Sequence, residues 1–214
     1  GNAPYGTRSA EEIYQMTCRG VQVLFEKGCK LVIIACNTAS AVALRKMQEE
    51  WVPNDKRVLG VFVPLIEKIT ERQWGDNSPP KKVSIRDVAL FATPSTVASK
   101  AFERELGFRA IGVNVESQPC DGLVDAIELG DLYLAEQLVE LYVDQLLQRL
   151  PKPEIIVLGC THYPLVSNFF HKYFEKGVQI LDHADIVSES LEDYLIRHPD
   201  KVGETMGSNY LTTG

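Results

Sequence analysis

KLVIIACNTAS (residues 30–40) and PEIIVLGCTHYP (residues 153–164) share one pattern, in which an apolar run is followed by a cysteine and then by polar residues. Short, uniformly apolar runs of this kind are typical of strands that are buried on both faces of a sheet. After each apolar run, the sequence favours a turn and then a helix. The pattern therefore predicts two strand, turn and helix units, with Cys36 and Cys160 at the carboxyl ends of their strands.

The same order of elements recurs along the rest of the chain. We expect further strands at 57–63, 87–92 and 107–115, and helices at 9–28, 40–50, 93–106 and 132–150, with two more that begin at Pro64 and near Pro164. Strands that alternate with helices in this way indicate an α/β fold with mostly parallel sheets.

A division into two similar α/β domains is expected from the position of the best surface loop. The segment QWGDNSPPKK (residues 73–82) combines turn formers, two prolines and charge without periodicity, so we place a domain crossover nearby. The predicted domains are 1–63 plus 184–214, and 64–183. Ligands of such folds bind beyond the carboxyl ends of the strands, which is where both cysteines are expected.

Composition excludes several classes of function. The chain has 214 residues, 45% of them hydrophobic, and a formal net charge of −7, which disfavours binding to nucleic acids or to anionic membranes. Its apolar runs are too short to span a membrane. The five cysteines form no C-x-x-C pair or Cys/His cluster, so neither a metal site nor a disulfide framework is expected. We expect a soluble, cytoplasmic protein.

Cys36 and Cys160 differ from ordinary buried cysteines. A free cysteine often serves as a small apolar side chain, and we favour that interpretation for Cys18 and Cys29. The two strand-end cysteines instead precede polar residues and helix starts, whose amides are expected to stabilise a thiolate and to lower the thiol pKa. A hydrolase needs one thiolate with a histidine base, and a redox pair needs two thiols within bonding distance. A third chemistry uses two thiols as acid and base on opposite faces of one substrate carbon.

The motifs ACNTAS (residues 35–40) and GCTHYPL (residues 159–165), with PYGTRS (residues 4–9) upstream, resemble the aspartate/glutamate racemase family, and within it the members that act on glutamate. The resemblance spans essentially the whole chain. It implies two α/β domains related by a pseudo-twofold axis, with the active site in the cleft between them. It also implies interconversion of L- and D-glutamate without a cofactor, which supplies D-glutamate for peptidoglycan.

The resemblance assigns roles to individual residues. It makes Cys36 and Cys160 the two proton donors and acceptors, and it makes His162, assisted by Glu128, the group that activates the second thiol. The substrate-binding residues that it implies are Tyr5, Gly6, Asn37, Thr38, Thr96, Thr161 and His162.

Some of these residues have a plainer interpretation. His162 is equally suited to capping or packing, and Glu128 to a solvated helix position. The match at Glu128 is loose, because Asp121 and Gly122 replace the family's usual proline and leucine. Thr96, and less so Thr93, either binds a substrate carboxylate or caps a helix.

The resemblance also leaves questions open. The family has a first strand ending in an Asp-Ser pair, whose aspartate assists the first cysteine, and this sequence begins after that point, so a chain without it is expected to be damaged or inactive. Aspartate racemase is the nearest alternative, although His162 favours glutamate. A hydantoin racemase, a one-cysteine decarboxylase and a non-catalytic binding or regulatory protein are further alternatives. The expected partner is a small-molecule substrate, and a homodimer is left open.

Overall fold

Parallel strand pairs form the frame of the protein. The computed structural model describes residues 5–6, 8–72, 76, 78–175, 177–203 and 209–211, and every strand pair within these ranges is parallel. The strands are β1 (Leu31–Ile34), β2 (Arg57–Gly60), β3 (Lys81–Lys82), β4 (Asp87–Ala92), β5 (Ala110–Ile111), β6 (Asn114–Pro119), β7 (Ile155–Gly159) and β8 (Gln179–Leu181). The predicted α/β class is confirmed.

Helices cover the sheets. They are α1 (Ala10–Glu26), α2 (Asn37–Ala39), α3 (Arg45–Glu50), α4 (Val63–Thr70), α5 (Pro94–Ser99), α6 (Ala101–Gly107), α7 (Leu123–Glu128), α8 (Leu132–Arg149), α9 (Ser167–His171) and α10 (Ala184–Arg197), with a π-helical turn at Ser40–Leu44 and 3₁₀ turns at Tyr163–Val166 and Pro199–Lys201. None of the helices in the described ranges is long and apolar enough to cross a membrane.

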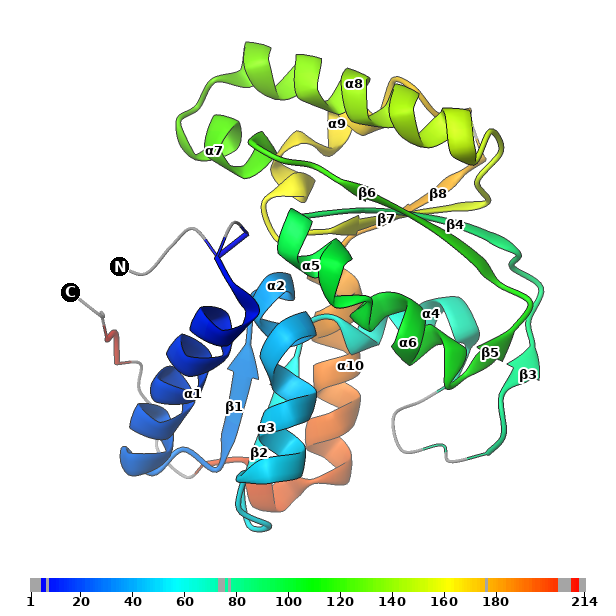
Figure 1. Cartoon of the computed structure of the whole chain (residues 1–214). Helices are drawn as coiled ribbons and strands as arrows, with labels where there is room; N and C mark the ends of the chain where they lie inside the picture. The colour runs from blue at the N-terminus through cyan, green and yellow to red at the C-terminus, as the bar shows by residue number, and fades with distance from the viewer. Residues whose placement is uncertain are drawn as a thin grey trace.

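The larger sheet has the strand order β6-β4-β7-β8 and is buried on both faces. On the central strand β4, Ala89 and Phe91 pack against α7, α8 and α9, whereas Val88 and Leu90 pack against α4 and α6. Figure 1 shows these two helical layers on opposite sides of the sheet. Burial on both faces explains why the central strands β4 and β7 are almost uniformly apolar, whereas the edge strand β6 is mostly polar and partly exposed.

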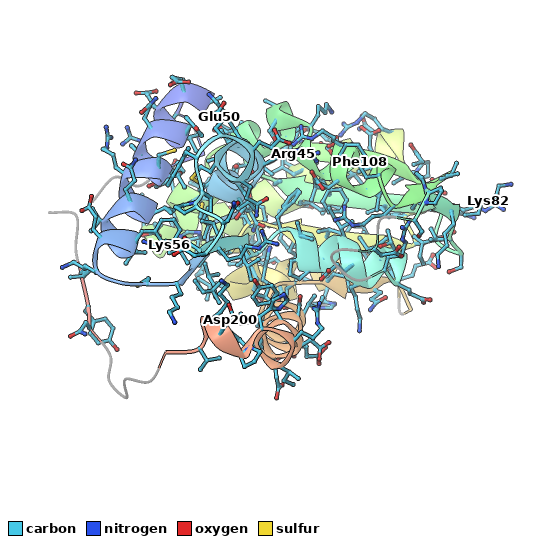
Figure 2. All side chains as sticks on the ribbon, turned by 90° about the horizontal axis from the view of Figure 1, so that it is seen from below. Arg45, Glu50, Lys56, Lys82, Phe108 and Asp200 are labelled. Atoms are coloured by element: carbon cyan, nitrogen blue, oxygen red, sulfur yellow. The ribbon has the colours of Figure 1, made fainter. Side chains whose placement is uncertain are left out.

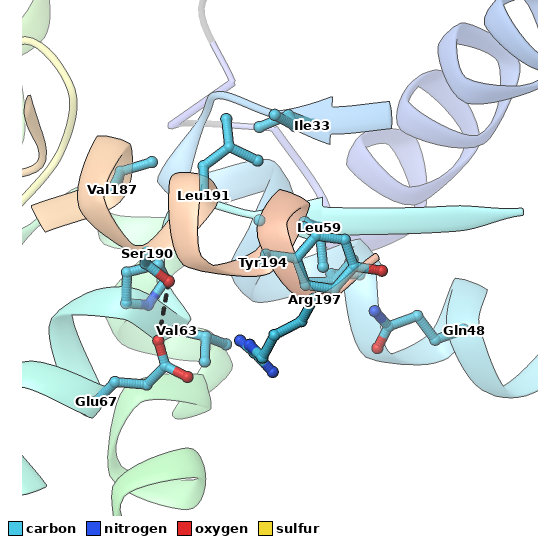
Figure 3. A pocket seen from close by; sticks show the side chains of 13 residues that line it. Ile33, Gln48, Leu59, Val63, Glu67, Val187, Ser190, Leu191, Tyr194 and Arg197 are labelled. Atoms are coloured by element: carbon cyan, nitrogen blue, oxygen red, sulfur yellow. Dashed lines mark hydrogen bonds between the residues drawn. The ribbon is translucent and has the colours of Figure 1, made fainter. Parts of the chain in front are cut away.

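A second sheet pairs β1 with β2, and a third, shorter one pairs β3 with β5. Val32 and Ile34 face a core formed with α1 and the helical segment after β1, whereas Ile33 faces α10. Figure 3 shows Val187 and Leu191 of α10 beside Ile33, around a small apolar pocket of about 60 Å³. Ile33 is nevertheless 40% exposed, whereas Val32 and Ile34 are buried, so the expected burial of this strand on both faces is met fully on only one of them.

Polar contacts join the helices beside the β1-β2 sheet to the helices beside the four-stranded sheet. Arg45 on α3 donates to Glu105 on α6 at 2.8 Å, and its guanidinium lies 4.9 Å from the centre of the Phe108 ring. Figure 2 shows Arg45 and Phe108 beside each other. On α10, the Ser190 hydroxyl donates to Glu67 of α4 at 3.1 Å (Figure 3). The domain boundaries at 63/64 and 183/184 stay predictions.

Several predicted elements differ in their limits. The helix expected from Ser40 begins at Asn37, and the helix expected over 93–106 is broken at Lys100, which has a φ of 52°. The strand expected over 107–115 is split at Gly112, where a φ of 80° suits glycine. The strand expected over 57–63 ends at Gly60. At Lys100 and Gly112 a positive φ interrupts the element within its apolar pattern.

The predicted surface loop at 73–82 is tied to the fold where it is described; residues 73–75 and 77 lie outside the described residues. The buried guanidinium of Arg72 donates to the carboxylate of Asp76 and to the carbonyl oxygens of Asp76, Ser78, Pro79 and Arg109. Lys81 and Lys82 then form β3, which pairs with β5. This part of the segment is therefore anchored by a buried cation.

Gly159, the last residue of β7, offers a test of the packing between β7 and β4. A Cβ atom there would lie 2.7 Å from Leu90 Cδ1 and 3.1 Å from the carbonyl oxygen of Phe91. We predict that Gly159→Ala lowers the free energy of unfolding by about 1–3 kcal/mol, because the backbone of β4 cannot yield without strain. Urea unfolding measures the change.

The matched control is Gly20→Ala in the exposed face of α1, where an added Cβ meets no atom within 4 Å. Alanine there should raise the free energy of unfolding by about 0.5–1 kcal/mol, because it favours the helix. Equal stability of the two variants would contradict the packing described here.

Candidate active site

A cavity of about 270 Å³ lies at the carboxyl ends of β1, β4, β6 and β7. Cys36, Thr93, Cys120 and Cys160 each follow one of these strands and line it. Its walls are formed by Tyr5, Gly6, Cys36, Asn37, Thr38, Thr93, Pro94, Cys120, Asp121, Gly122, Val124, Asp125, Glu128, Cys160, Thr161 and His162. The structure thus brings the two strand-end cysteines to one cavity.

The Cys36 side of the cavity is built on the start of a helix. Cys36 is partly exposed and directly precedes α2, while Asn37 and Thr38 are buried. Burial raises the pKa of Tyr5, and the nearby Cys36 adds to the increase. The carbonyl oxygen of Gly6 accepts a hydrogen bond from the Ser95 hydroxyl at 2.7 Å, which fixes the loop before α1 against α5.

A chain of polar contacts leads away from the second thiol. The Cys160 sulfur lies 3.8 Å from Nδ1 of His162, and Nε2 of His162 lies 2.6 Å from Oε1 of Glu128. A carboxylate only accepts hydrogen bonds, so Glu128 fixes the imidazole proton on Nε2. When the ring carries that single proton, Nδ1 is an acceptor and lies beside the Cys160 sulfur.

The protonation of Cys160 differs from the expectation. Burial raises the pKa of this thiol from its ordinary 9.0 to about 11, which outweighs the lowering by the backbone amides of His162 and Tyr163, and the nearby Cys36 raises it further. The expectation that helix amides lower the pKa of both thiols is wrong for Cys160. Desolvation of the thiolate is the stronger effect, so Cys160 rests as a neutral thiol at pH 7.

Three buried threonine hydroxyls connect α2 with α5, which lie side by side in Figure 1. The Thr38 and Thr93 oxygens are 2.8 Å apart, those of Thr93 and Thr96 are 2.9 Å apart, and Thr96 donates to Thr38 at 3.2 Å. Thr93 and Thr38 line the cavity, whereas Thr96 does not and bonds to both of them. Thr93 therefore lies nearer to the cavity than the sequence suggested.

Sequence reasoning did not predict the wall formed by the end of β6 and by α7. Cys120, Asp121, Gly122, Val124 and Asp125 line the cavity there, and burial raises the pKa of the Cys120 thiol. His183, which contacts Asn37 from the turn before α10, was also missed. The run VQILDHADIV repeats the strand, turn and helix pattern and was the available signal for β8, His183 and α10. Among the described residues, His, Cys, Asp and Glu form no group of three that could hold a metal ion.

The arrangement is suited to proton transfer, because two thiols and a histidine–carboxylate pair meet in one cavity of a parallel α/β frame. The chain belongs to the Asp/Glu/Hydantoin racemase family, whose profile matches residues 2–191. The family resemblance carried by the cysteine motifs is thereby confirmed.

Relatives and solved structures agree with this assignment. Glutamate racemases of Paracoccus denitrificans and Dinoroseobacter shibae are each 61% identical over 213 residues, which cover 100% of this chain and 79% and 78% of the relatives. The structure of glutamate racemase from Francisella tularensis in complex with D-glutamate matches 96% of this chain and 71% of that one, with a TM-score of 0.77 and 25% identity. The structure of glutamate racemase isoform RacE1 from Bacillus anthracis matches 92% of this chain and 69% of that one, with a TM-score of 0.74 and 28% identity.

The raised pKa of Cys160 predicts its reactivity. Because only the thiolate is alkylated, the rate for Cys160 should rise about tenfold per pH unit from about pH 8 to about pH 10, without levelling off. Iodoacetamide labelling followed by peptide mass spectrometry measures the rate, and the urea-unfolded protein is the control. A plateau near pH 9 in the folded protein would show that burial does not raise the pKa.

Proposed function

We propose that this protein interconverts L- and D-glutamate without a cofactor, using Cys36 and Cys160 as acid and base on opposite faces of Cα. The observation that carries this function is the presence of both thiols on the wall of one cavity. The glutamate racemases that are 61% identical over the whole chain support glutamate as the substrate. The similar fold of a racemase with D-glutamate bound supports it further.

The reaction needs a site that stabilises negative charge. The α-proton of an amino acid is weakly acidic, and without an electron sink the carbanion must be stabilised by hydrogen-bond donors around the carboxylate. Asn37, Thr38 and Thr161 line the cavity and carry such donors. One cysteine accepts the α-proton as a thiolate, and the other delivers a proton to the opposite face as a thiol.

Cys160 needs help before it can act as a base. Its thiol is neutral at rest, because burial raises its pKa to about 11. His162 Nδ1 lies beside the sulfur and can accept the thiol proton, and the resulting imidazolium is stabilised by Glu128 at 2.6 Å. In the reverse direction Cys160 starts as the thiol and donates its proton to the substrate carbon.

The biological role follows from the product. We propose that the D-glutamate is used for peptidoglycan in the cytoplasm, as the family resemblance implies. Loss of D-glutamate from cells in which the protein is depleted would support this role, and normal D-glutamate there would contradict it.

Substitution of each cysteine tests the two-base reaction. Cys36→Ser and Cys160→Ser should each lower the rate of racemisation at least about 1,000-fold in both directions, because a serine hydroxyl is a far weaker acid than a thiol. Circular dichroism of L- and D-glutamate over time measures the rate. In deuterium oxide, the wild-type product should carry deuterium at Cα.

The control is Cys29→Ser, which removes a cysteine that does not line the cavity and should retain the wild-type rate. Retained turnover in Cys160→Ser would overturn the two-base assignment. Turnover of D-aspartate in preference to D-glutamate would assign the other substrate, and no change with either would favour a binding protein.

Glu128 is expected to act through His162. We predict that Glu128→Gln lowers kcat about 10- to 100-fold with a small change in KM, because an amide does not stabilise the imidazolium as a carboxylate does. Glu140→Gln, on the exposed face of α8, is the matched control. An unchanged kcat in Glu128→Gln would show that the 2.6 Å contact has no role in proton transfer.

A further inference from the structure

His183 makes a buried contact with the cavity wall from a distant part of the chain. It lies in the turn between β8 and α10, and its Nε2 is 2.8 Å from Oδ1 of Asn37, which is 146 residues away in sequence. The His183 side chain is buried, and Asn37 is only 2% exposed. Both side chains are therefore shielded from solvent, and their polar atoms need hydrogen-bond partners within the protein.

The chemistry of the two side chains decides which atom donates. Burial lowers the pKa of His183 to about 4, and Asp182 opposes this only in part, so the imidazole is neutral and carries one N–H. An amide oxygen accepts hydrogen bonds and cannot donate them. The proton therefore resides on Nε2, and Nδ1 is left as a bare acceptor.

This bond sets the direction of the Asn37 amide. With Oδ1 bound to His183, the Nδ2 group keeps two N–H donors, and it has no hydrogen-bond partner among the described residues. Asn37 lines the cavity that contains both cysteines. Nδ2 is itself buried, and it is the end of the amide that has no hydrogen-bond partner among the described residues.

The opposite orientation is unfavourable. If Asn37 were rotated so that Nδ2 donated to Nε2, the imidazole proton would move to Nδ1, which is buried and has no acceptor among the described residues. A buried donor without an acceptor is more costly than a buried bare acceptor nitrogen of a neutral ring. The rotated amide would also turn its oxygen toward a carboxylate ligand.

We propose that His183 is a positioning residue that holds the Asn37 amide with its N–H groups available to the substrate carboxylate. This role rests on the proposed function, which makes the ligand an anionic amino acid. His183 does not line the cavity, so it acts through Asn37 and not by contact with the substrate.

Two substitutions separate this role from simple packing. His183→Leu keeps an apolar volume but removes the donor, and we expect KM for glutamate to rise about tenfold with a smaller change in kcat, as for the loss of one hydrogen bond to a charged group. His183→Gln can place an amide N–H where Nε2 lies and should return KM close to the wild-type value. A KM that is unchanged in His183→Leu, with only a lower melting temperature, would show a purely structural role.

A double-mutant cycle tests the route through Asn37. In the background of Asn37→Ala, the His183→Leu change should have little further effect on KM, because the amide that it positions is gone. Additive effects of the two changes would overturn the proposal.

Nitrogen-15 NMR of the histidine rings gives a readout that does not depend on turnover. The His183 ring should show a protonated Nε2 and an unprotonated Nδ1 at pH 7, and the reverse tautomer would overturn the proposed orientation. If the wild-type protein does not racemise glutamate while this tautomer is found, the proposed substrate fails but the amide orientation stands.

Discussion

At Gly159 of β7, a Cβ atom would lie 2.7 Å from Leu90 Cδ1 and 3.1 Å from the carbonyl oxygen of Phe91, both on the neighbouring strand β4, so a larger residue requires β4 to shift. Cys160 is the next residue, so its position is fixed by the backbone of a sheet that is buried on both faces. Thr93 and Cys120 follow the neighbouring strands β4 and β6 of the same sheet. They lie at the same edge as Cys160, because parallel strands align their carboxyl ends. The geometry of the cavity therefore depends on backbone packing more than on contacts between the reactive groups.

Burial shifts the pKa values of Cys160 and His183 in opposite directions. It keeps Cys160 protonated by raising its pKa, and it keeps His183 neutral by lowering its pKa. In both cases desolvation disfavours the charged form. In the proposed reaction the neutral thiol passes its proton to His162, and in the proposed orientation the neutral His183 ring donates its one proton to Asn37. Two of the groups at the cavity, Cys160 and His183, are thus uncharged at rest, although acidic side chains such as Glu128 also line it.

The sequence predicted the parts of the fold that local patterns encode. The apolar runs at 31–34 and 155–159 predicted the strands β1 and β7. The break at Lys100 and the split at Gly112 depend on backbone angles that no periodicity reveals. For the site, the cysteine motifs located both thiols, but the raised pKa of Cys160 and the contact of His183 with Asn37 depend on tertiary burial. Residues that meet only in the folded chain leave no local pattern.

The bond between Asn37 and His183 also constrains how the molecule assembles. Residues 31–60 can pair β1 with β2 early, because their contacts are close in sequence. The wall of the cavity at Asn37 is finished only when the turn before α10 docks, 146 residues later. During synthesis, Asn37 therefore lacks this hydrogen-bond partner until at least 146 further residues have been made.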